Sequence, residues 1–291
     1  MKRRYFTFIA LSLILVMLVL SAGCGVRING KEYELFSVSE KDKESIIVDM
    51  DETQDDQQIS EEKQDGEQLE ISNDSGNVTI EKSEGTQIKI KVDKKVRGSS
   101  KDKKNTILEN MNVKLERDGK VIKVVVKTDD GKDFWDWQQD NYRGIQTTIN
   151  YDISLPEGIN VIEVNTGAGN IDVNDVSAKL SLETGAGNID VQDVVALEDN
   201  SINTGAGNID FNGNIDKISS FDASTGVGNV KFKVPEGTKM SLNADTGVGV
   251  LSGEFIKTRT EDKFHFSGDI NGGGPEVNLN TGVGNVKADD N

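Results

Sequence analysis

The chain has 291 residues, of which 29% are charged, and its formal net charge at pH 7 is −17. Such an acidic protein repels nucleic acid and resists lying flat on anionic lipid, so we expect neither as a direct partner of the protein surface. With one cysteine and one histidine the sequence offers no disulfide framework and no common zinc ligand set, and we expect no cofactor.

The segment from Met1 to Cys24 resembles a bacterial lipoprotein signal peptide. Three basic residues at positions 2 to 4 precede an uncharged run from Phe6 to Ala22, and small residues stand directly before Cys24. This pattern predicts removal of residues 1–23 and attachment of diacylglycerol to Cys24, which would hold the protein on the extracytoplasmic face of the cell membrane. An uncleaved membrane helix is the alternative, although the uncharged run is close to the minimum length for a span.

Residues 24–68 are predicted to form a lipidated N-terminus followed by a flexible acidic spacer. Between Asp49 and Gln68 there are nine acidic residues, one base at Lys63 and almost no apolar residue. A segment of this composition repels itself and cannot pack a core. The alternative is an acidic tract that recruits a cation or a partner.

Ordered structure is expected from Leu69 to about residue 290. Residues 75–80 read like a degenerate copy of a motif that recurs later, and residues 88–92 alternate apolar and charged side chains, as in a half-buried strand. The Asp118-Gly119 pair predicts a tight hairpin turn before the strand at 121–126.

Both tryptophans lie in the stretch Phe134-Trp135-Asp136-Trp137, which we expect between strands. One interpretation is that these rings cover an edge or side of the fold. The other is a platform for glycan stacking or partner anchoring, and Tyr142 can join either arrangement.

The sequence Thr-Gly-(Ala/Val)-Gly occurs six times, and the first five copies follow one another at a nearly constant interval. The copies begin at Thr166, Thr184, Thr204, Thr225, Thr246 and Thr281. This period is too short for helix-pair repeats and fits one turn of a β-solenoid. The position two residues before each Thr and the position two residues after each second Gly are apolar in every copy, which predicts two buried columns.

The motif itself is expected to form the corner of each coil. Glycine permits positive φ and close backbone approach, and the following Asn tolerates such a conformation and can hydrogen-bond to the same residue in the next coil. The predicted corner residues are Gly167, Gly169, Asn170, Gly185, Gly187, Asn188, Gly205, Gly207, Asn208, Gly226, Gly228 and Asn229. We therefore predict an all-β, single-stranded β-helix with one motif in each coil of about 18–21 residues, most regular over positions 160–290.

The sequence argues against a cation site and against an enzymatic site. Asp172, Asp190 and Asp210 form an outward column that could bind calcium, but the next equivalent residue is Lys231 and the repeat is longer than that of calcium-binding β-rolls. His265 has no second histidine or cysteine with which to form a catalytic dyad. We expect no metal and no catalytic residue.

The run from Ile71 to Val78, the segment Ile153 to Gly158 and the serial Thr-Gly-x-Gly-Asn copies resemble the LiaG-like adhesin family over roughly residues 65–290. The resemblance implies a β-helical domain of a Gram-positive type of envelope, with an association with envelope stress and no catalytic residues. The function predicted is a membrane-anchored, non-catalytic binding or scaffold module whose partner is a cell-wall polymer or an envelope protein. The alternative is a cation-dependent, polysaccharide-active β-helix enzyme.

Overall fold

The computed structural model describes residues 26–28, 31–33, 52–64, 66–256 and 263–291. The chain divides into two units, Met1–Asp49 and Met50–Asn291. In the first unit, β1 (Val26–Ile28) pairs with β2 (Lys31–Tyr33) as an antiparallel hairpin. Cys24 and the expected signal peptide lie outside the described residues.

The second unit is almost entirely β-structure. Its strands are β3 (Glu52–Glu62), β4 (Glu67–Ser75), β5 (Val78–Ser83), β6 (Gln87–Arg97), β7 (Asn112–Asp118), β8 (Val121–Lys127), β9 (Gln146–Pro156), β10 (Ile159–Ala168), β11 (Ile171–Asn174), β12 (Ser177–Ala186), β13 (Ile189–Ala206), β14 (Ile209–Val227), β15 (Val230–Val234), β16 (Met240–Val248), β17 (Leu251–Ser252), β18 (His265–Ile270), β19 (Glu276–Val283) and β20 (Val286–Asp290). Its helices are α2 (Lys101–Glu109) and α3 (Phe134–Asn141). None of the helices in the described ranges is long and apolar enough to cross a membrane.

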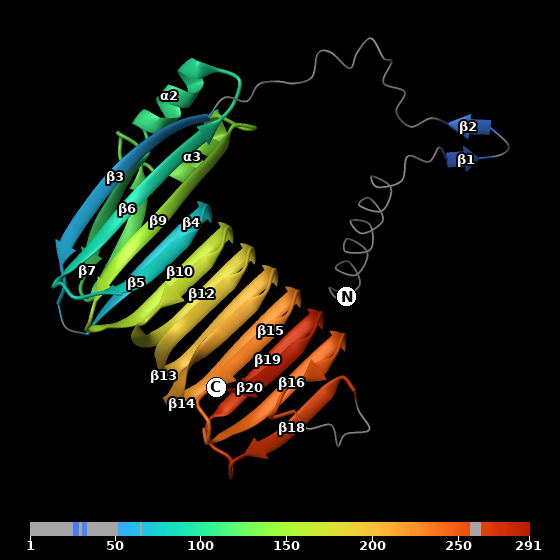
Figure 1. The fold of residues 1–291 in the computed structure, drawn as a ribbon. Helices are drawn as coiled ribbons and strands as arrows, with labels where there is room; N and C mark the ends of the chain where they lie inside the picture. The colour runs from blue at the N-terminus through green and yellow to red at the C-terminus, as the bar shows by residue number, and fades with distance from the viewer. Residues whose placement is uncertain (1–25, 29–30, 34–51, 65, 257–262) are drawn as a thin grey trace. The chain divides into compact units, whose positions relative to one another are not determined.

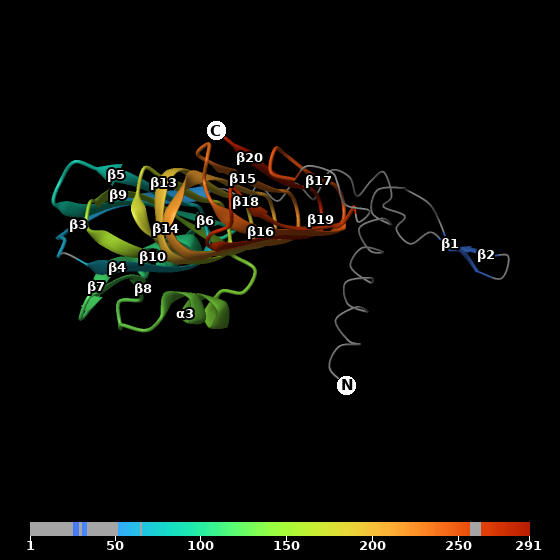
Figure 2. The same ribbon diagram turned by 90° about the horizontal axis from the view of Figure 1, so that it is seen from below.

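Successive coils stack side by side through parallel strand pairs, as the row of arrows in Figure 1 shows. One layer runs β4–β10–β12–β13–β14–β19–β16, and the other runs β5–β11–β13–β14–β15–β20. Figure 2 shows the two layers from below. This all-β, solenoid-like stack is the coarse architecture that the repeats predict.

The core lies between the two layers and contains both predicted columns. Ile171, Ile189, Ile209, Val230, Leu251 and Val286 are buried, as are Val164, Leu182, Ile202, Ala223, Ala244 and Leu279. Within the described residues, the buried hydrophobic side chains run from Leu69 to Ala288, all inside the second unit. That unit therefore carries its own core and can be expected to fold alone.

The coils do not stack in chain order at the C-terminal end. Strand β19, which holds the last Thr-Gly-Val-Gly copy, pairs with β14 on one side and with β16 on the other. The sixth copy is thus inserted between the fourth and the fifth. Strand β18 then pairs antiparallel with the other edge of β16.

The acidic segment differs from the expected spacer, because residues 52–62 form β3. This strand pairs antiparallel with the lysine-rich β6, and cross-strand ion pairs join Arg97 to Glu52 (3.1 Å) and Lys94 to Asp55 (3.1 Å). Opposite charges on facing strands remove the self-repulsion that made this segment look unstructured. Composition of the segment alone does not reveal a complementary strand elsewhere in the chain.

Arg117 fixes the end of this acidic strand to the body. Its guanidinium contacts the carboxylate of Glu61 (2.9 Å), the backbone carbonyl of Glu62 (2.8 Å) and the fully buried carboxylate of Glu67. A buried carboxylate is tolerated only when such a partner compensates its charge.

Candidate functional site

The repeated corners are held by a ladder of threonine hydroxyls. The Oγ1 of Thr184 donates to the carbonyl of Gly169 (2.9 Å), and Thr204 donates in the same way to Gly187 (2.8 Å). The same bond recurs from Thr225, Thr246 and Thr281 to a glycine of the adjacent coil. These threonines are buried, so each hydroxyl finds its hydrogen-bond partner in the adjacent coil.

The second glycine of each corner cannot be replaced without moving the stack. Gly187 has φ of 156°, and a Cβ built on it would lie 2.0 Å from the carbonyl oxygen of Gly169 in the adjacent coil. Gly207 has the same relation to Gly187 at 1.9 Å. Glycine stands at these positions because the backbones of neighbouring coils approach closely.

The asparagines after the glycines form a second ladder. The expected amide-to-amide bond is present where Nδ2 of Asn229 donates to Oδ1 of Asn208 (3.0 Å) and Nδ2 of Asn208 donates to Oδ1 of Asn188 (3.3 Å), and backbone N–H groups donate to the same oxygens. The backbone N–H of Asn188 donates to Oδ1 of Asn170 (2.9 Å), and that of Asn208 donates to Oδ1 of Asn188 (2.8 Å). In the terminal coil Val250 replaces the asparagine, and its N–H donates to Asn285 (3.0 Å). No later coil needs an acceptor there, which explains the valine.

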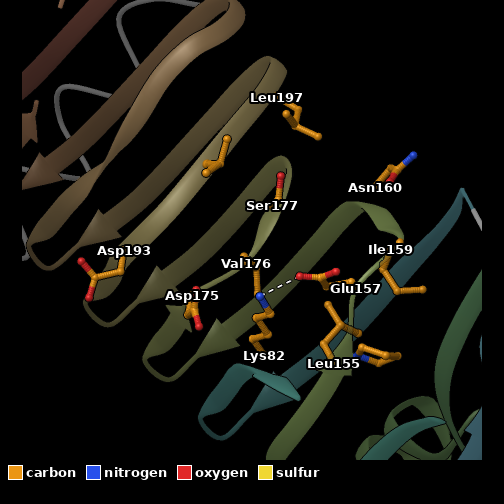
Figure 3. A pocket seen from close by; sticks show the side chains of 13 residues that line it. Lys82, Leu155, Glu157, Ile159, Asn160, Asp175, Val176, Ser177, Asp193 and Leu197 are labelled. Carbon is orange, nitrogen blue, oxygen red and sulfur yellow. Dashed lines mark ion pairs between the residues drawn. The ribbon is translucent and has the colours of Figure 1, made fainter. Parts of the chain in front are cut away.

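A pocket of about 430 Å³ lies where several coils turn back on the other side of the stack (Figure 3). Its rim contains Lys82 from β5, Glu157 from the turn after β9, Asp175 from the bend after β11, and Asp193 from an irregular position within β13. Val176 and Leu197 are among its apolar walls. A polar rim around an apolar wall is the general form of a ligand site.

Two rim residues occupy a backbone conformation that is uncommon for residues other than glycine. Asp175 has φ of 52° and Asp193 has φ of 55°. Aspartate tolerates this left-handed region better than most residues, yet the conformation still costs free energy that the stack must offset. The two equivalent turns thus aim a carboxylate outward at the same place in successive coils.

Lys82 and Glu157 form the ion pair that closes one side of the pocket, with Nζ 2.7 Å from Oε1 (Figure 3). The hydrogen bond and charge of Glu157 raise the pKa of Lys82, and Asp175 adds to this rise. The bond from Lys82 lowers the pKa of Glu157. Because the Glu157 side chain is 79% exposed, solvent screens the pair and a ligand can reach it.

The three aspartates considered for calcium lie in adjacent coils. Asp172 is in register with Asp190, and Asp190 with Asp210, whose carboxylate accepts an ion pair from Lys231 at 3.1 Å. Burial and the charge of Asp190 raise the pKa of Asp172. Among the residues whose placement is described, no group of three or more side chains is arranged to hold a metal ion.

The tryptophan stretch lies between the strands β8 and β9, as expected, and forms helix α3. Asp133 caps this helix, because its side chain accepts hydrogen bonds from the backbone N–H groups of Trp135 and Asp136. Trp135, Trp137 and Tyr142 are half-buried and pack against the core, with 5.2 Å between the ring centres of Trp137 and Tyr142. The rings thus cover part of the fold, and ligand contact by their exposed edges stays a prediction.

The structure does not bring this aromatic group and the pocket together in one site. No residue of α3 lines the pocket. The rim residues Lys82, Glu157, Asp175 and Asp193 were not among the predicted site residues. The recurrence of Asp four residues after the buried Ile171 and Ile189 is the signal that could have indicated the outward turn.

Comparison with known proteins identifies the family. The Toastrack DUF4097 family model matches residues 66–271, and the chain belongs to this family. No curated protein matches the chain.

Solved structures with a similar course include a "putative cell adhesion protein" from Clostridium sporogenes, with 16% identity, 82% of this chain and 100% of that chain covered, and a TM-score of 0.47. A "putative adhesin" from Bacteroides fragilis has 13% identity, 81% and 97% coverage, and a TM-score of 0.30. A "putative lipid binding protein" from Parabacteroides distasonis has 12% identity, 79% and 96% coverage, and a TM-score of 0.29.

Proposed function

We propose that this protein is a non-catalytic binding module of the cell envelope, anchored to the extracytoplasmic face of the membrane through a lipid on Cys24. In this proposal the coils from residue 160 onward are a single-stranded β-helix, and the stiff stack presents a binding surface to a cell-wall polymer or an envelope protein. The signal-like segment that ends at Cys24 supports the anchor, and family membership supports an envelope role of the LiaG-like kind.

The observation that carries the proposal is the pocket beside the Lys82–Glu157 ion pair. Equivalent turns of successive coils supply its rim, so its shape is fixed by the stacking of strands and does not depend on a free loop. Binding sites on rigid elements hold their groups in place before the ligand arrives, which reduces the entropy lost on binding.

The charges of the rim indicate the chemistry of the ligand. Three carboxylates, from Glu157, Asp175 and Asp193, stand against the single ammonium of Lys82. Such a rim favours a ligand that donates hydrogen bonds from hydroxyl or amino groups, while the apolar wall accepts its less polar face. Polysaccharides with amino groups and basic peptides both have these features.

The test is sedimentation of residues 50–291 with purified cell-wall sacculi. Lys82→Met/Glu157→Gln should weaken saturable binding by at least about tenfold, which corresponds to about 1.4 kcal/mol. The control is Lys123→Met/Glu70→Gln, because Lys123 and Glu70 form a lysine–glutamate ion pair between β8 and β4 at 3.0 Å, and neither residue lines the pocket.

Two further arms separate the alternatives. Loss of binding in Trp135→Ala/Trp137→Ala with retention in the Lys82/Glu157 variant would move the site to α3. Dependence on calcium would direct attention to Asp172, Asp190 and Asp210. The proposal fails if sacculi and extracts of envelope protein bind neither the wild type nor any variant.

A further inference from the structure

The large apolar side chains that the structure leaves exposed, among the residues it describes, gather at one end of the stack. They are Val227 (58% exposed), Val248 (65%), Val250 (60%), Val283 (50%) and Phe264 (52%). The four valines belong to the Thr-Gly-Val-Gly corners of the last three coils in space or directly follow one. We call these four side chains the valine ridge.

The valine ridge is continuous because the strands that carry it are neighbours. Val283 is in register with Val227 on one side and with Val248 on the other. Parallel strands lie about 4.8 Å apart, so these side chains form a row of evenly spaced knobs. The row continues in the earlier coils as Ala206, Ala186 and Ala168, whose side chains are too small to project.

Charge is sparse on both sides of the valine ridge. Asn229 and Asn285 follow it on one side, and Ser224 and Asn280 precede it on the other. The one charged member of the preceding row in these three coils is Asp245, which is in register with Asn280 and pairs with His265 at 2.6 Å. Such sparse charge is unusual for a chain in which 29% of residues are charged and the net charge is −17. The cores of protein interfaces are depleted of charge in the same way, and an exposed cluster of apolar side chains marks such a surface.

We propose that the valine ridge is a self-association surface and that its partner is a second copy of this chain. Two copies related by a twofold axis would place their ridges antiparallel, with the knobs of one copy between the knobs of the other. The matching spacing is supplied automatically, because both ridges have the same strand separation, as in the interdigitated zippers of stacked β-sheets.

The charge pattern and the residue types favour a second copy over a bilayer. Two strongly acidic bodies repel each other, so only an uncharged strip allows close approach. Segments that lie on membranes combine aromatic side chains with lysine or arginine along their length. Lys263 and the exposed Phe264 lie beside the terminal coil, but the ridge itself carries neither an aromatic nor a basic side chain. The ridge is narrower than a standard interface of about 800 Å² per partner, so the dimer should be weak, with a Kd of roughly 10 µM or more.

The test is sedimentation velocity of residues 50–291 over a range from about 1 to 500 µM. Val227→Ala/Val248→Ala/Val283→Ala should weaken dimerisation by at least about tenfold without lowering the unfolding midpoint. The fold should accept this variant because the earlier coils already contain Thr-Gly-Ala-Gly. Ala206→Val is the matched variant that should strengthen dimerisation, because it adds one more valine to the ridge.

A second experiment uses the full chain in membranes, with a photo-crosslinking amino acid at position 227 or, as the control, at position 195 in the pocket. A covalent dimer from position 227 only is the expected result. A wild type that stays monomeric at the highest concentration, an unchanged dimer in the alanine variant, or adducts from 227 only to other proteins or lipid would overturn the proposal. These readouts do not involve sacculi, so they stand or fall independently of the ligand-binding test.

Discussion

Replacing Gly207 with alanine should be one of the most damaging single changes in the stack. The new Cβ would lie 1.9 Å from the carbonyl oxygen of Gly187, whereas Cβ atoms essentially never approach another atom within 3.0 Å. The two coils must therefore separate locally by more than about 1 Å. The hydrogen bonds that cross this contact include three backbone N–H donors, at 3.0 Å from Gly187 to Ala206, 2.9 Å from Ile189 to Asn208, and 2.8 Å from Asn208 to the Asn188 side chain.

Losing three bonds at about 1 kcal/mol each, together with about 1–2 kcal/mol for a side chain at φ of 154°, lowers the free energy of unfolding by about 4–5 kcal/mol. The control is Gly237→Ala, because Gly237 has φ of 83° and nothing within 4 Å of an added Cβ. That change should cost only the backbone strain, about 1–2 kcal/mol. Urea unfolding followed by far-UV circular dichroism measures both values. Equal losses for the two variants would refute the contact between coils as the reason for glycine.

Three further changes test the interior. Arg117→Ala should lower the free energy of unfolding in urea by about 3–5 kcal/mol, because it leaves the buried Glu67 carboxylate without its cation, and Arg117→Met/Glu67→Gln should recover part of the loss. Tyr151→Phe should leave the thermal midpoint unchanged or raise it, since the buried Tyr151 hydroxyl has no hydrogen-bond partner among the residues that the structure describes; a loss above about 1 kcal/mol would reveal a partner. The pKa of Asp172 is raised by burial and by Asp190, so its contribution to stability is full below pH 3.8 and is lost as pH rises through the folded-state pKa. Unfolding measured from pH 3 to 7 should therefore show a smaller loss on raising the pH in Asp172→Asn than in the wild type, and identical profiles would contradict this.

The interior of the stack was predictable because its signal is repeated. Every coil has an apolar side chain at each of the same two positions. Val164, Ile171 and their equivalents could therefore be assigned to the core from the sequence repeat alone. The glycine corners were predictable for the same reason. Every copy contains the glycines that a corner lying close to the adjacent coil requires.

Features that depend on pairing between distant segments were not predictable from local composition. The acidic strand β3 is ordered by β6 and Arg117, which come much later in the chain. Helix α3 depends on the Asp133 cap and on packing of its aromatic rings. In the sequence the cap is a single residue and the helix is only 8 residues long, so no helical periodicity could be recognised. The pocket arises only when turns from separate coils come together.

The spatial order of the last coils could have been predicted from a single residue in the sequence. Every copy of the motif offers the same inward residues, so either order of Thr246 and Thr281 would bury the same columns. The distinguishing residue is Val250, which lacks the side-chain oxygen that each coil lends to the next. A coil without that oxygen must be the last one in space.

The insertion of β19 between β14 and β16 also determines the order in which the coils can fold. While β16 and β17 are available for folding but β19 and β20 are not, the fifth copy lacks the neighbour on which it docks in the stack, because β19 and β20 form that neighbour. The fifth copy must therefore wait for β19 and β20, while the earlier coils can assemble one after another. A chain that loses its C-terminal residues would consequently lose two coils from the stack, and its exposed valines would be separated from one another.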